Sequence, residues 1–310
     1  MTQPGTGKYE RLLERCHGLA AITTAVAWPC DETSLSGAID AMRQDLITPI
    51  LVGPSAVITE LARSKGIALG GAEIVDVADS RAAAARAVAL VREGRAELVM
   101  KGSLHSDEVL SAVIAKETGL RTGRRLSHVF LMDVPTYHKV LIVTDAAINI
   151  APTLEDKVDI VQNAIDLARS FGVEQPKVAI LAAVETVNSK MPATLDAAAL
   201  CKMADRGQIK GGLLDGPLAF DNAISRDAAK IKGIVSEVAG DPDILLAPDL
   251  EAGNMMAKQL SFLANADSAG MVLGARVPVI LTSRADSLRS RIASCAVAVL
   301  AAHARRQPPK

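Results

Sequence analysis

The sequence predicts an α/β protein with a mainly parallel sheet flanked by helices, and three observations support this prediction. Patterns typical of buried strands and amphipathic helices alternate along most of the 310 residues. Hydrophobic residues make up 49% of the chain, which is enough for a large core, whereas aromatic residues make up only 2%. Such small aliphatic side chains let helices pack closely on a parallel sheet. At this length we expect two domains, or one large one.

The first part of the chain alternates strands and helices with short connections. Its apolar runs predict strands at residues 22–28, 50–53, 74–77 and 98–102. Helical spacing and turn residues predict helices at residues 9–20, from a cap at Thr33 or Ser34 to residue 46, from Ser55 to Gly66, from Ser80 to Gly94, and from Ser106 to Gly119.

The middle of the chain breaks this alternation. Strand-like runs at residues 127–134 and 140–144 are separated only by PTYHK. Because parallel neighbours need a crossover of about a dozen residues or more, we expect these two strands to pair antiparallel and to mark a domain boundary. Beyond them the alternation predicts a helix at 153–171, a strand at 178–182, a helix from Pro192, strands at 212–214, 244–247, 270–273 and 279–282, and a final helix from Asp286.

Composition and missing motifs argue against several functions. A formal net charge of -1 and few aromatic residues disfavour nucleic-acid binding. Apolar runs too short for a bilayer and an N-terminus without a signal peptide predict a soluble cytoplasmic protein with no membrane partner. The four cysteines show no CxxC spacing and are expected to be free thiols. The chain has no GxGxxG after a strand, no GxSxG, and no histidine pair with metal spacing, although a metal site built from distant aspartates stays open.

Polar residues that follow the strands are the candidate ligand-binding groups, because ligands of open α/β sheets bind beyond the carboxyl ends of the strands. Lys101, His105 and Ser106 follow one strand at a predicted helix N-terminus. Free amides and the helix dipole favour an anion there. The alternative is that Ser106 only caps its helix and Lys101 lies in water.

Three arginines, Arg121, Arg124 and Arg125, lie among glycines in TGLRTGRRLSH. The planar guanidinium group matches phosphate oxygens bidentately, so this segment is a candidate phosphate site. A solvated loop with surface arginines is the alternative.

Amides and carboxylates follow later strands as well, including Asn149, Glu185 and Asn222. Each alone is typical of a turn or cap, but their recurrence at successive strand ends favours a binding site. Ser283, Arg284 and Asp286 follow the last predicted strand. Asp286 either caps the final helix or takes part in chemistry, and one residue can do both.

Seven strings of residues, in this order, extend over most of the chain: VMKGSLHS, KETGLRTGRRLSHVF, VTDAAINIAP, ETVNSKMPAT, ADRGQIKGGLLDGPLAFDNAIS, PDLEAGN and VPVILTSRADS. Together they resemble the phosphate acetyltransferase and phosphate butyryltransferase family, and their residues look closer to those of the butyryltransferase branch. The resemblance implies reversible transfer of a short acyl group, butyryl or acetyl, between coenzyme A and inorganic phosphate.

The resemblance also implies an architecture. The expected fold is like that of the isocitrate and isopropylmalate dehydrogenases, with two α/β domains and the active site in the cleft between them. The first domain would be discontinuous, residues 1–127 with 274–310, and the second would be residues 128–273. It further implies a homodimer or higher homo-oligomer, acyl-CoA and inorganic phosphate as partners, and no metal or redox cofactor.

In the acetyltransferase branch a Ser-Arg pair near the C-terminus is catalytic, and by the resemblance it corresponds to Ser283 and Arg284 here. That branch has a proposed aspartate base seven residues beyond the serine, where this chain has Ser290. Asp286 is the nearest carboxylate, so we expect it to accept the thiol proton. Ser283 is expected to hydrogen-bond the developing oxyanion or thiolate.

The remaining candidates are expected to bind phosphate or coenzyme A. Arg284 would act with Lys101 and Arg124 on the phosphate. The other candidates for this role are His105, Ser106, Arg121, Asn149 and Asn222.

Three alternatives stay open from the sequence. A metal- and NAD-dependent decarboxylating dehydrogenase on the same fold would need carboxylates that converge on a divalent cation. A regulator that binds CoA or acyl phosphate would bind without turnover. A third possibility is an acyltransferase or phosphate-utilising enzyme with a different acceptor.

Overall fold

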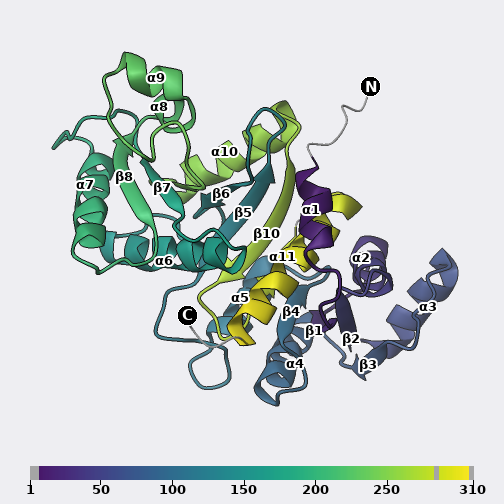
Figure 1. The fold of residues 1–310 in the computed structure, drawn as a ribbon. Helices are drawn as coiled ribbons and strands as arrows, with labels where there is room; N and C mark the ends of the chain where they lie inside the picture. The colour runs from purple at the N-terminus through teal and green to yellow at the C-terminus, as the bar shows by residue number, and fades with distance from the viewer. Residues whose placement is uncertain (1–6, 283–285, 307–310) are drawn as a thin grey trace. The chain divides into compact units, whose positions relative to one another are not determined.

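The computed structural model describes residues 7–282 and 286–306 (Figure 1). By its internal contacts the chain divides into two compact units. Unit 1 comprises Met1–Lys8 and Arg125–Ser268, and unit 2 comprises Tyr9–Arg124 and Ala269–Lys310. Both units alternate strands with helices, as the sequence predicts for an α/β protein.

Unit 2 is built on a mainly parallel sheet. Its strand order is β3-β2-β1-β4-β11-β10, and only the β10–β11 pair is antiparallel. In the register of β1 and β4, Ala27 lies opposite Lys101. The strands are β1 (Ile22–Ala27), β2 (Ile47–Gly53), β3 (Glu73–Asp76), β4 (Leu98–Lys101), β10 (Asp267–Leu273) and β11 (Val279–Ile280).

Helices flank the sheet of unit 2, and α4 packs on β1, β2 and β4. These helices are α1 (Lys8–Glu14), α2 (Glu32–Arg43), α3 (Ser55–Lys65), α4 (Ser80–Arg92), α5 (Ser106–Ile114) and α11 (Leu288–Arg306). The predicted stop of α3 at Gly66 is confirmed, because this glycine ends the helix in the left-handed region with a φ of 64°. Helix α1 is shorter than the predicted 9–20.

The cap predicted for α2 at Thr33 or Ser34 is wrong, whereas α4 begins at Ser80 as predicted. An aspartate occupies the cap in both helices, since the Asp31 carboxylate accepts from the Ser34 amide at 2.7 Å and the Asp79 carboxylate accepts from the Ala82 amide at 2.9 Å. Aspartate caps as well as serine, and here it lies at the position from which its oxygen reaches the third amide of the helix. Helix α3 follows Pro54 and has no side-chain cap.

Unit 1 has a second set of strands in the order β5-β6-β9-β7-β8. The predicted hairpin is confirmed, because β5 and β6 pair antiparallel with Val129 opposite Thr144. The other pairs are parallel. The strands are β5 (Ser127–Asp133), β6 (Leu141–Thr144), β7 (Lys177–Leu181), β8 (Leu213–Leu218) and β9 (Ile244–Leu246).

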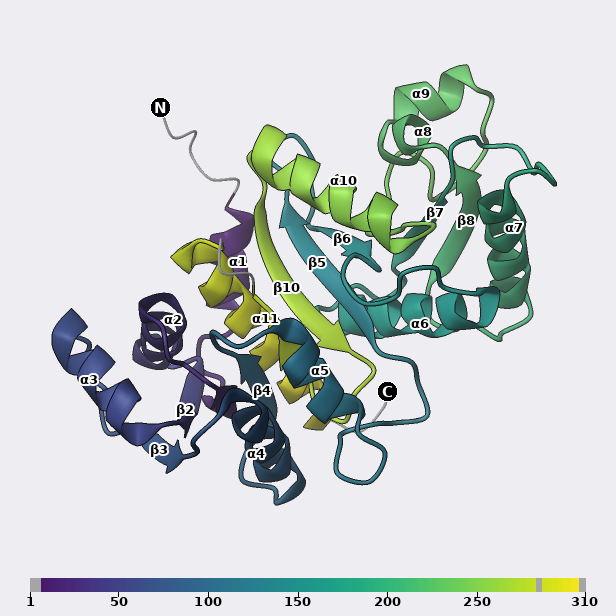
Figure 2. The same cartoon turned by 180° about the vertical axis from the view of Figure 1, so that it is seen from behind.

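The helices of unit 1 cover a core that includes Met132, Val143, Leu181 and Leu245. Helix α6 contacts β5, β6 and β9, and α10 runs along β5 and β6 (Figure 2). The helices are α6 (Leu154–Ser170), α7 (Pro192–Asp205), α8 (Phe220–Ile224), α9 (Arg226–Ile231) and α10 (Leu250–Leu263). The last three were not predicted from the sequence.

All four cysteines are free, as predicted. No helix within residues 7–282 and 286–306 combines the length and the apolar character that a membrane span requires.

Candidate functional site

Lys101 is the last residue of β4, and its side chain is buried at the carboxyl edge of the sheet of unit 2. The residue is only 5% exposed. Its ammonium group lies 3.4 Å from the Gly102 carbonyl oxygen and 3.5 Å from the Thr282 carbonyl oxygen. The alternative that Lys101 lies in water is therefore wrong. Burial of an ammonium group is costly because the group loses its water shell. The contact with Thr282 places this buried group next to the residue that precedes Ser283.

Ser283 and Arg284 lie outside the described residues, but the start of the following helix is defined. The Ser287 hydroxyl accepts from the Ser290 amide at 3.1 Å and is the cap of α11. The alternative that Asp286 caps this helix is therefore wrong, because Asp286 lies one residue too early. Asp286 itself is half-buried.

Ser290, at the position of the acetyltransferase-branch aspartate, is part of the packing of α11. It is 8% exposed, and its carbonyl accepts from the Ser294 hydroxyl at 2.8 Å. The Ser294 hydroxyl in turn accepts from the Gly270 amide at 3.0 Å. The Ser290 hydroxyl accepts from the Ser287 hydroxyl at 3.2 Å, which gives this side chain a structural role at the start of α11.

His105 and Ser106 lie at the N-terminus of α5, where an anion was predicted. His105 occupies the cap position and Ser106 is the first helical residue, so the alternative that Ser106 caps the helix is wrong. A carboxylate of the chain already lies at this end: Glu108 accepts from the His105 amide at 2.9 Å and from the Ser80 hydroxyl at 2.6 Å. The Ser80 bond is the main reason why the pKa of Glu108 lies below its usual value. The helix dipole is thus partly compensated from within the protein.

Arg121 and Arg124 are exposed residues on an anchored loop. Arg121 forms an isolated antiparallel bridge with Ala275. The Thr122 hydroxyl donates to the Gly274 carbonyl at 2.6 Å and accepts from the Arg124 amide at 3.1 Å. The backbone between the two arginines is therefore tied to the segment after β10.

Asn149 and Arg125 meet at a strand end in unit 1. The Arg125 guanidinium donates to the Asn149 side-chain oxygen at 2.6 Å and lies 3.0 Å from the Asp156 carboxylate. The Asn149 side-chain nitrogen donates to Asp145 at 2.5 Å and to the Leu126 carbonyl at 2.9 Å. Both the oxygen and the nitrogen of this side-chain amide are thus hydrogen-bonded within unit 1. The role of Asn149 in ligand binding stays a prediction.

Asp145 and His128 form a buried pair next to Asn149. The Asp145 carboxylate accepts amides that include Ala147 at 2.9 Å and His128 at 3.2 Å. Burial lowers the pKa of His128 to about 4, and the charge of Asp145 opposes this shift only in part. His128 is therefore neutral at pH 7. An aspartate that follows a strand is typical of a turn, and the amides that Asp145 accepts agree with this role.

Asn222 belongs to a second group of polar side chains in unit 1. It is fully buried, and its side-chain nitrogen donates to Glu185 at 3.2 Å. The Lys232 ammonium also donates to Glu185, at 3.0 Å, and this bond is the main cause that lowers the pKa of Glu185. An ionised Glu185 fixes the Asn222 nitrogen toward itself. Lys232 was not identified from the sequence, because it lies ten residues beyond Asn222, in the turn that follows α9.

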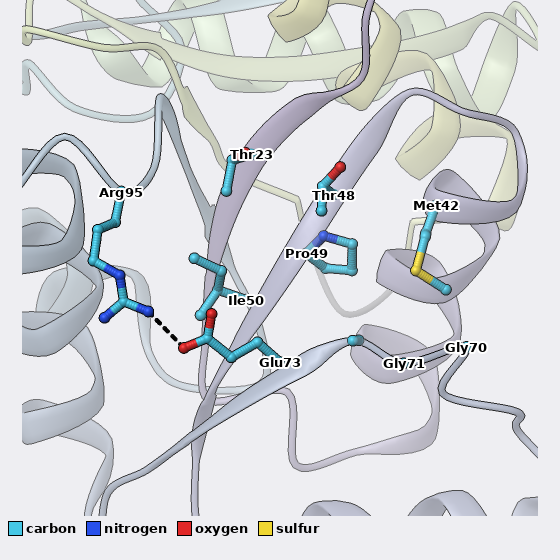
Figure 3. Close-up of a pocket in the computed structure, with 10 residues that line it drawn as sticks. Thr23, Met42, Thr48, Pro49, Ile50, Gly70, Gly71, Glu73 and Arg95 are labelled. Carbon is cyan, nitrogen blue, oxygen red and sulfur yellow. Dashed lines mark hydrogen bonds and ion pairs between the residues drawn. The ribbon is translucent and has the colours of Figure 1, made fainter.

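A cavity of about 350 Å³ in unit 2 lies apart from all these residues (Figure 3). Its lining includes Thr23, Thr48 and Glu73, which lie at the starts of β1, β2 and β3. Glu73 pairs with Arg95 at 2.6 Å. The cavity is thus at the amino edge of the sheet, whereas Lys101 is at the carboxyl edge. None of the predicted site residues lines it.

The four thiols are poor candidates for an enzyme nucleophile. Burial raises the pKa of Cys16 and Cys30 to about 11, and that of Cys201 and Cys295 to about 12. A thiolate is the reactive form, so these cysteines are protonated and unreactive at neutral pH.

Comparisons with known proteins agree with the resemblance in the sequence. A family model described as "Phosphate acetyl/butaryl transferase" matches residues 79–299. The chain is 64% identical to a phosphate acetyltransferase of Rhizobium meliloti, over 96% of this chain and 95% of the relative. It is 45% identical to a phosphate butyryltransferase of Clostridium acetobutylicum, over 90% of this chain and 92% of the relative.

A solved structure gives the same answer for the fold. A branched-chain phosphotransacylase from Enterococcus faecalis V583 superimposes with a TM-score of 0.80 at 30% identity, covering 91% of this chain and 99% of that chain. The expected closeness to the butyryltransferase branch is not reflected in the two identities above, since the acetyltransferase relative is the more similar of the two.

Proposed function

The chain belongs to the phosphate acetyltransferase and phosphate butyryltransferase family, and we infer from this that it reversibly transfers a short acyl group between coenzyme A and inorganic phosphate. It is thus an acyltransferase, with coenzyme A as substrate. The dehydrogenase and regulator alternatives are not favoured, because the relatives that match nearly the whole chain are named as transferases.

The observation that carries a mechanism is the position of Lys101. Its buried ammonium, 3.5 Å from the Thr282 carbonyl, gives unit 2 a cation immediately before the Ser283-Arg284 pair. A positive charge held away from water interacts strongly with a dianionic phosphate. We propose that Lys101 and Arg284 hold the phosphate, together with Arg124 from the loop that Thr122 anchors.

The proposed reaction needs no enzyme nucleophile. In one direction a phosphate oxygen attacks the thioester carbonyl, the carbon–sulfur bond breaks, and the CoA thiolate leaves. In the other direction the CoA thiolate attacks the acyl phosphate and phosphate leaves. Asp286 accepts the thiol proton in the second direction and returns it in the first, while Ser283 donates a hydrogen bond to the oxyanion. The raised pKa values of the four thiols support this direct route.

The other candidate residues have more peripheral roles in this proposal. Arg121, His105 and Ser106 lie in unit 2 and would bind the charged parts of coenzyme A. Asn149 and Asn222 lie in unit 1 and would shape its binding surface, since their amides are held by Arg125 and Glu185.

The proposal also includes the expected architecture and partners. We propose two domains, residues 1–127 with 274–310 and residues 128–273, in a dehydrogenase-like arrangement with the substrates in the cleft between them. We further propose a cytoplasmic homo-oligomer that requires no metal or redox cofactor, because cations, hydroxyls and amides can neutralise both phosphate and oxyanion.

The test is a panel of acyl-CoA substrates, from acetyl to butyryl and branched chains, assayed for thiol release. We expect release only when inorganic phosphate is present, and formation of the matching acyl phosphate. Binding of acyl-CoA without any phosphate-dependent release would support the regulator instead. Reduction of NAD with a hydroxy acid would support the dehydrogenase.

A further inference from the structure

Trp28 is the only tryptophan of the chain, and it stands at the carboxyl edge of the sheet of unit 2. It directly follows β1, whose last residue, Ala27, lies opposite Lys101. Trp28 therefore lies just beyond the end of the strand next to β4, at the edge where open α/β sheets bind their ligands. The proposed reaction gives no role to this side chain.

The backbone of Trp28 adopts a conformation that a bulky residue rarely takes. Its φ is 57°, in the left-handed region. Such a conformation is strained for a residue with a side chain and persists only where the surroundings enforce it. Glycine would adopt this conformation without strain, so the turn alone does not require a tryptophan. The presence of the largest side chain here indicates that the indole itself has a role.

The surroundings of Trp28 do enforce this conformation. Its amide donates to the Val52 carbonyl at 2.7 Å, and its carbonyl accepts both the amide and the hydroxyl of Ser103 at 2.9 Å. Gly102 packs so closely that a Cβ there would lie 2.4 Å from the Trp28 carbonyl oxygen. The segment that follows Lys101 and the segment that carries the indole are thus locked together.

The indole is not a core side chain. Trp28 is half-buried, whereas the large side chains at the centre of the sheet, such as Leu51 and Met100, are fully buried. A Cβ added to Gly53 at the end of β2 would lie 3.6 Å from the indole, in ordinary contact. The ring therefore rests on the end of β2 with part of its surface open at the sheet edge.

We propose that Trp28 forms one wall of the acyl-binding site and contacts the acyl chain of the substrate, an inference that rests on the proposed function. Lys101 holds the phosphate in that function, so the reacting carbonyl carbon lies next to it. Trp28 and Lys101 follow neighbouring strands, about 4.8 Å apart, and the indole covers the end of β2 on the other side of β1, so an acyl chain that extends from that carbon across the end of β1 would meet the ring. The adenine ring of coenzyme A is separated from the thioester by the whole pantetheine arm and is therefore not the expected partner.

A single tryptophan makes this contact directly measurable in the intact protein. Its emission is recorded while acetyl-CoA, butyryl-CoA, free CoA or 3′,5′-ADP is added without phosphate, so that no phosphorolysis occurs. We expect butyryl-CoA to change the emission most and 3′,5′-ADP to leave it unchanged. Equal changes with free CoA and butyryl-CoA, or a full change with 3′,5′-ADP alone, would overturn the acyl contact.

Chain-length selectivity provides the second measurement. In Trp28→Ala, kcat/KM for butyryl-CoA should fall about tenfold relative to that for acetyl-CoA, since each methylene in an apolar pocket is worth about tenfold or more. Trp28→Phe should recover most of this ratio. Phe262→Ala removes a 78% exposed aromatic side chain from α10 and is the matched control that should leave the ratio unchanged.

The outcomes separate this inference from the proposed function. If no acyl-CoA releases thiol with phosphate, the proposed function fails. If the wild-type protein turns over normally and the selectivity ratio is the same in Trp28→Ala, only the role of Trp28 fails. Should the alanine variant not fold, the phenylalanine variant and the wild-type emission still decide.

Discussion

The Lys101 ammonium lies 3.5 Å from the carbonyl oxygen of Thr282, so two segments that are 181 residues apart in sequence bring a buried cation to the residue that precedes Ser283. This contact joins β4 to the end of β11, its parallel neighbour in unit 2. The proposed phosphate site depends on it, because the other two cations assigned to phosphate come from Arg124 on a loop and from Arg284.

The first prediction concerns the charge of Lys101. Lys101→Met keeps the length of the side chain but removes the cation, and we expect kcat/KM for phosphate to fall about 100-fold or more. Steady-state kinetics with varied phosphate measure this. Lys65→Met, which removes an exposed lysine that pairs with Glu32, is the control and should leave the kinetics unchanged. Normal phosphate kinetics in folded Lys101→Met would refute the site.

The second prediction separates Asp286 from the helix cap beside it. Asp286→Asn should lower kcat by about 100-fold at neutral pH if the carboxylate accepts the thiol proton, with little change in thermal stability. Ser287→Ala should do the reverse, because it removes the cap of α11 and costs about 1 kcal/mol of stability. Turnover and thermal unfolding of both variants test the assignment. Near-normal turnover in Asp286→Asn would show that another group is the base.

The third prediction concerns the geometry of the Arg124 side chain. Arg124→Lys keeps the charge but loses the planar fork, so we expect a raised KM for phosphate with folding intact. The control is Arg63→Lys on α3, where the guanidinium pairs with Glu60 on the surface. An unchanged phosphate KM in Arg124→Lys would remove this residue from the phosphate site.

Much of the fold could be predicted, because apolar runs identify buried strands wherever they occur. The hairpin of β5 and β6 followed from the short PTYHK connection alone. Helix α10 was missed because Met255, Phe262 and Leu263 are exposed and blur its amphipathic pattern. Helices α8 and α9 have only 5 and 6 residues, which is too short for a periodic pattern to show.

The candidate site could be predicted less completely, for a physical reason. Sequence order shows that Lys101 and Asn149 follow strands, but not which groups surround them. Lys101 is buried beside Thr282, whereas both ends of the Asn149 amide are held by neighbours such as Arg125. Such partners depend on tertiary packing between segments that are distant in the chain.

The fourth prediction concerns metal ions. Lys101, Arg124 and Arg284 provide enough positive charge to neutralise a phosphate, so activity should survive exhaustive dialysis against EDTA. The assay is phosphate-dependent CoA release before and after chelation, at constant ionic strength. Loss of activity that is restored by stoichiometric magnesium or manganese would contradict the proposed mechanism and favour the dehydrogenase class.

The last prediction follows from the buried histidine of unit 1. Burial lowers the pKa of His128 from 6.5 to about 4, so between these values the unfolded chain binds a proton that the folded chain does not. Stability is then greatest above pH 6.5 and falls as the pH drops toward 4, by on the order of 1 kcal/mol per pH unit. Urea unfolding at pH 7, 6, 5 and 4.5 measures this slope. In His128→Phe the slope over this range should shrink, whereas His17→Gln, which changes an exposed histidine, should keep it. The same slope in His128→Phe and the wild-type protein would show that other groups control the acid sensitivity.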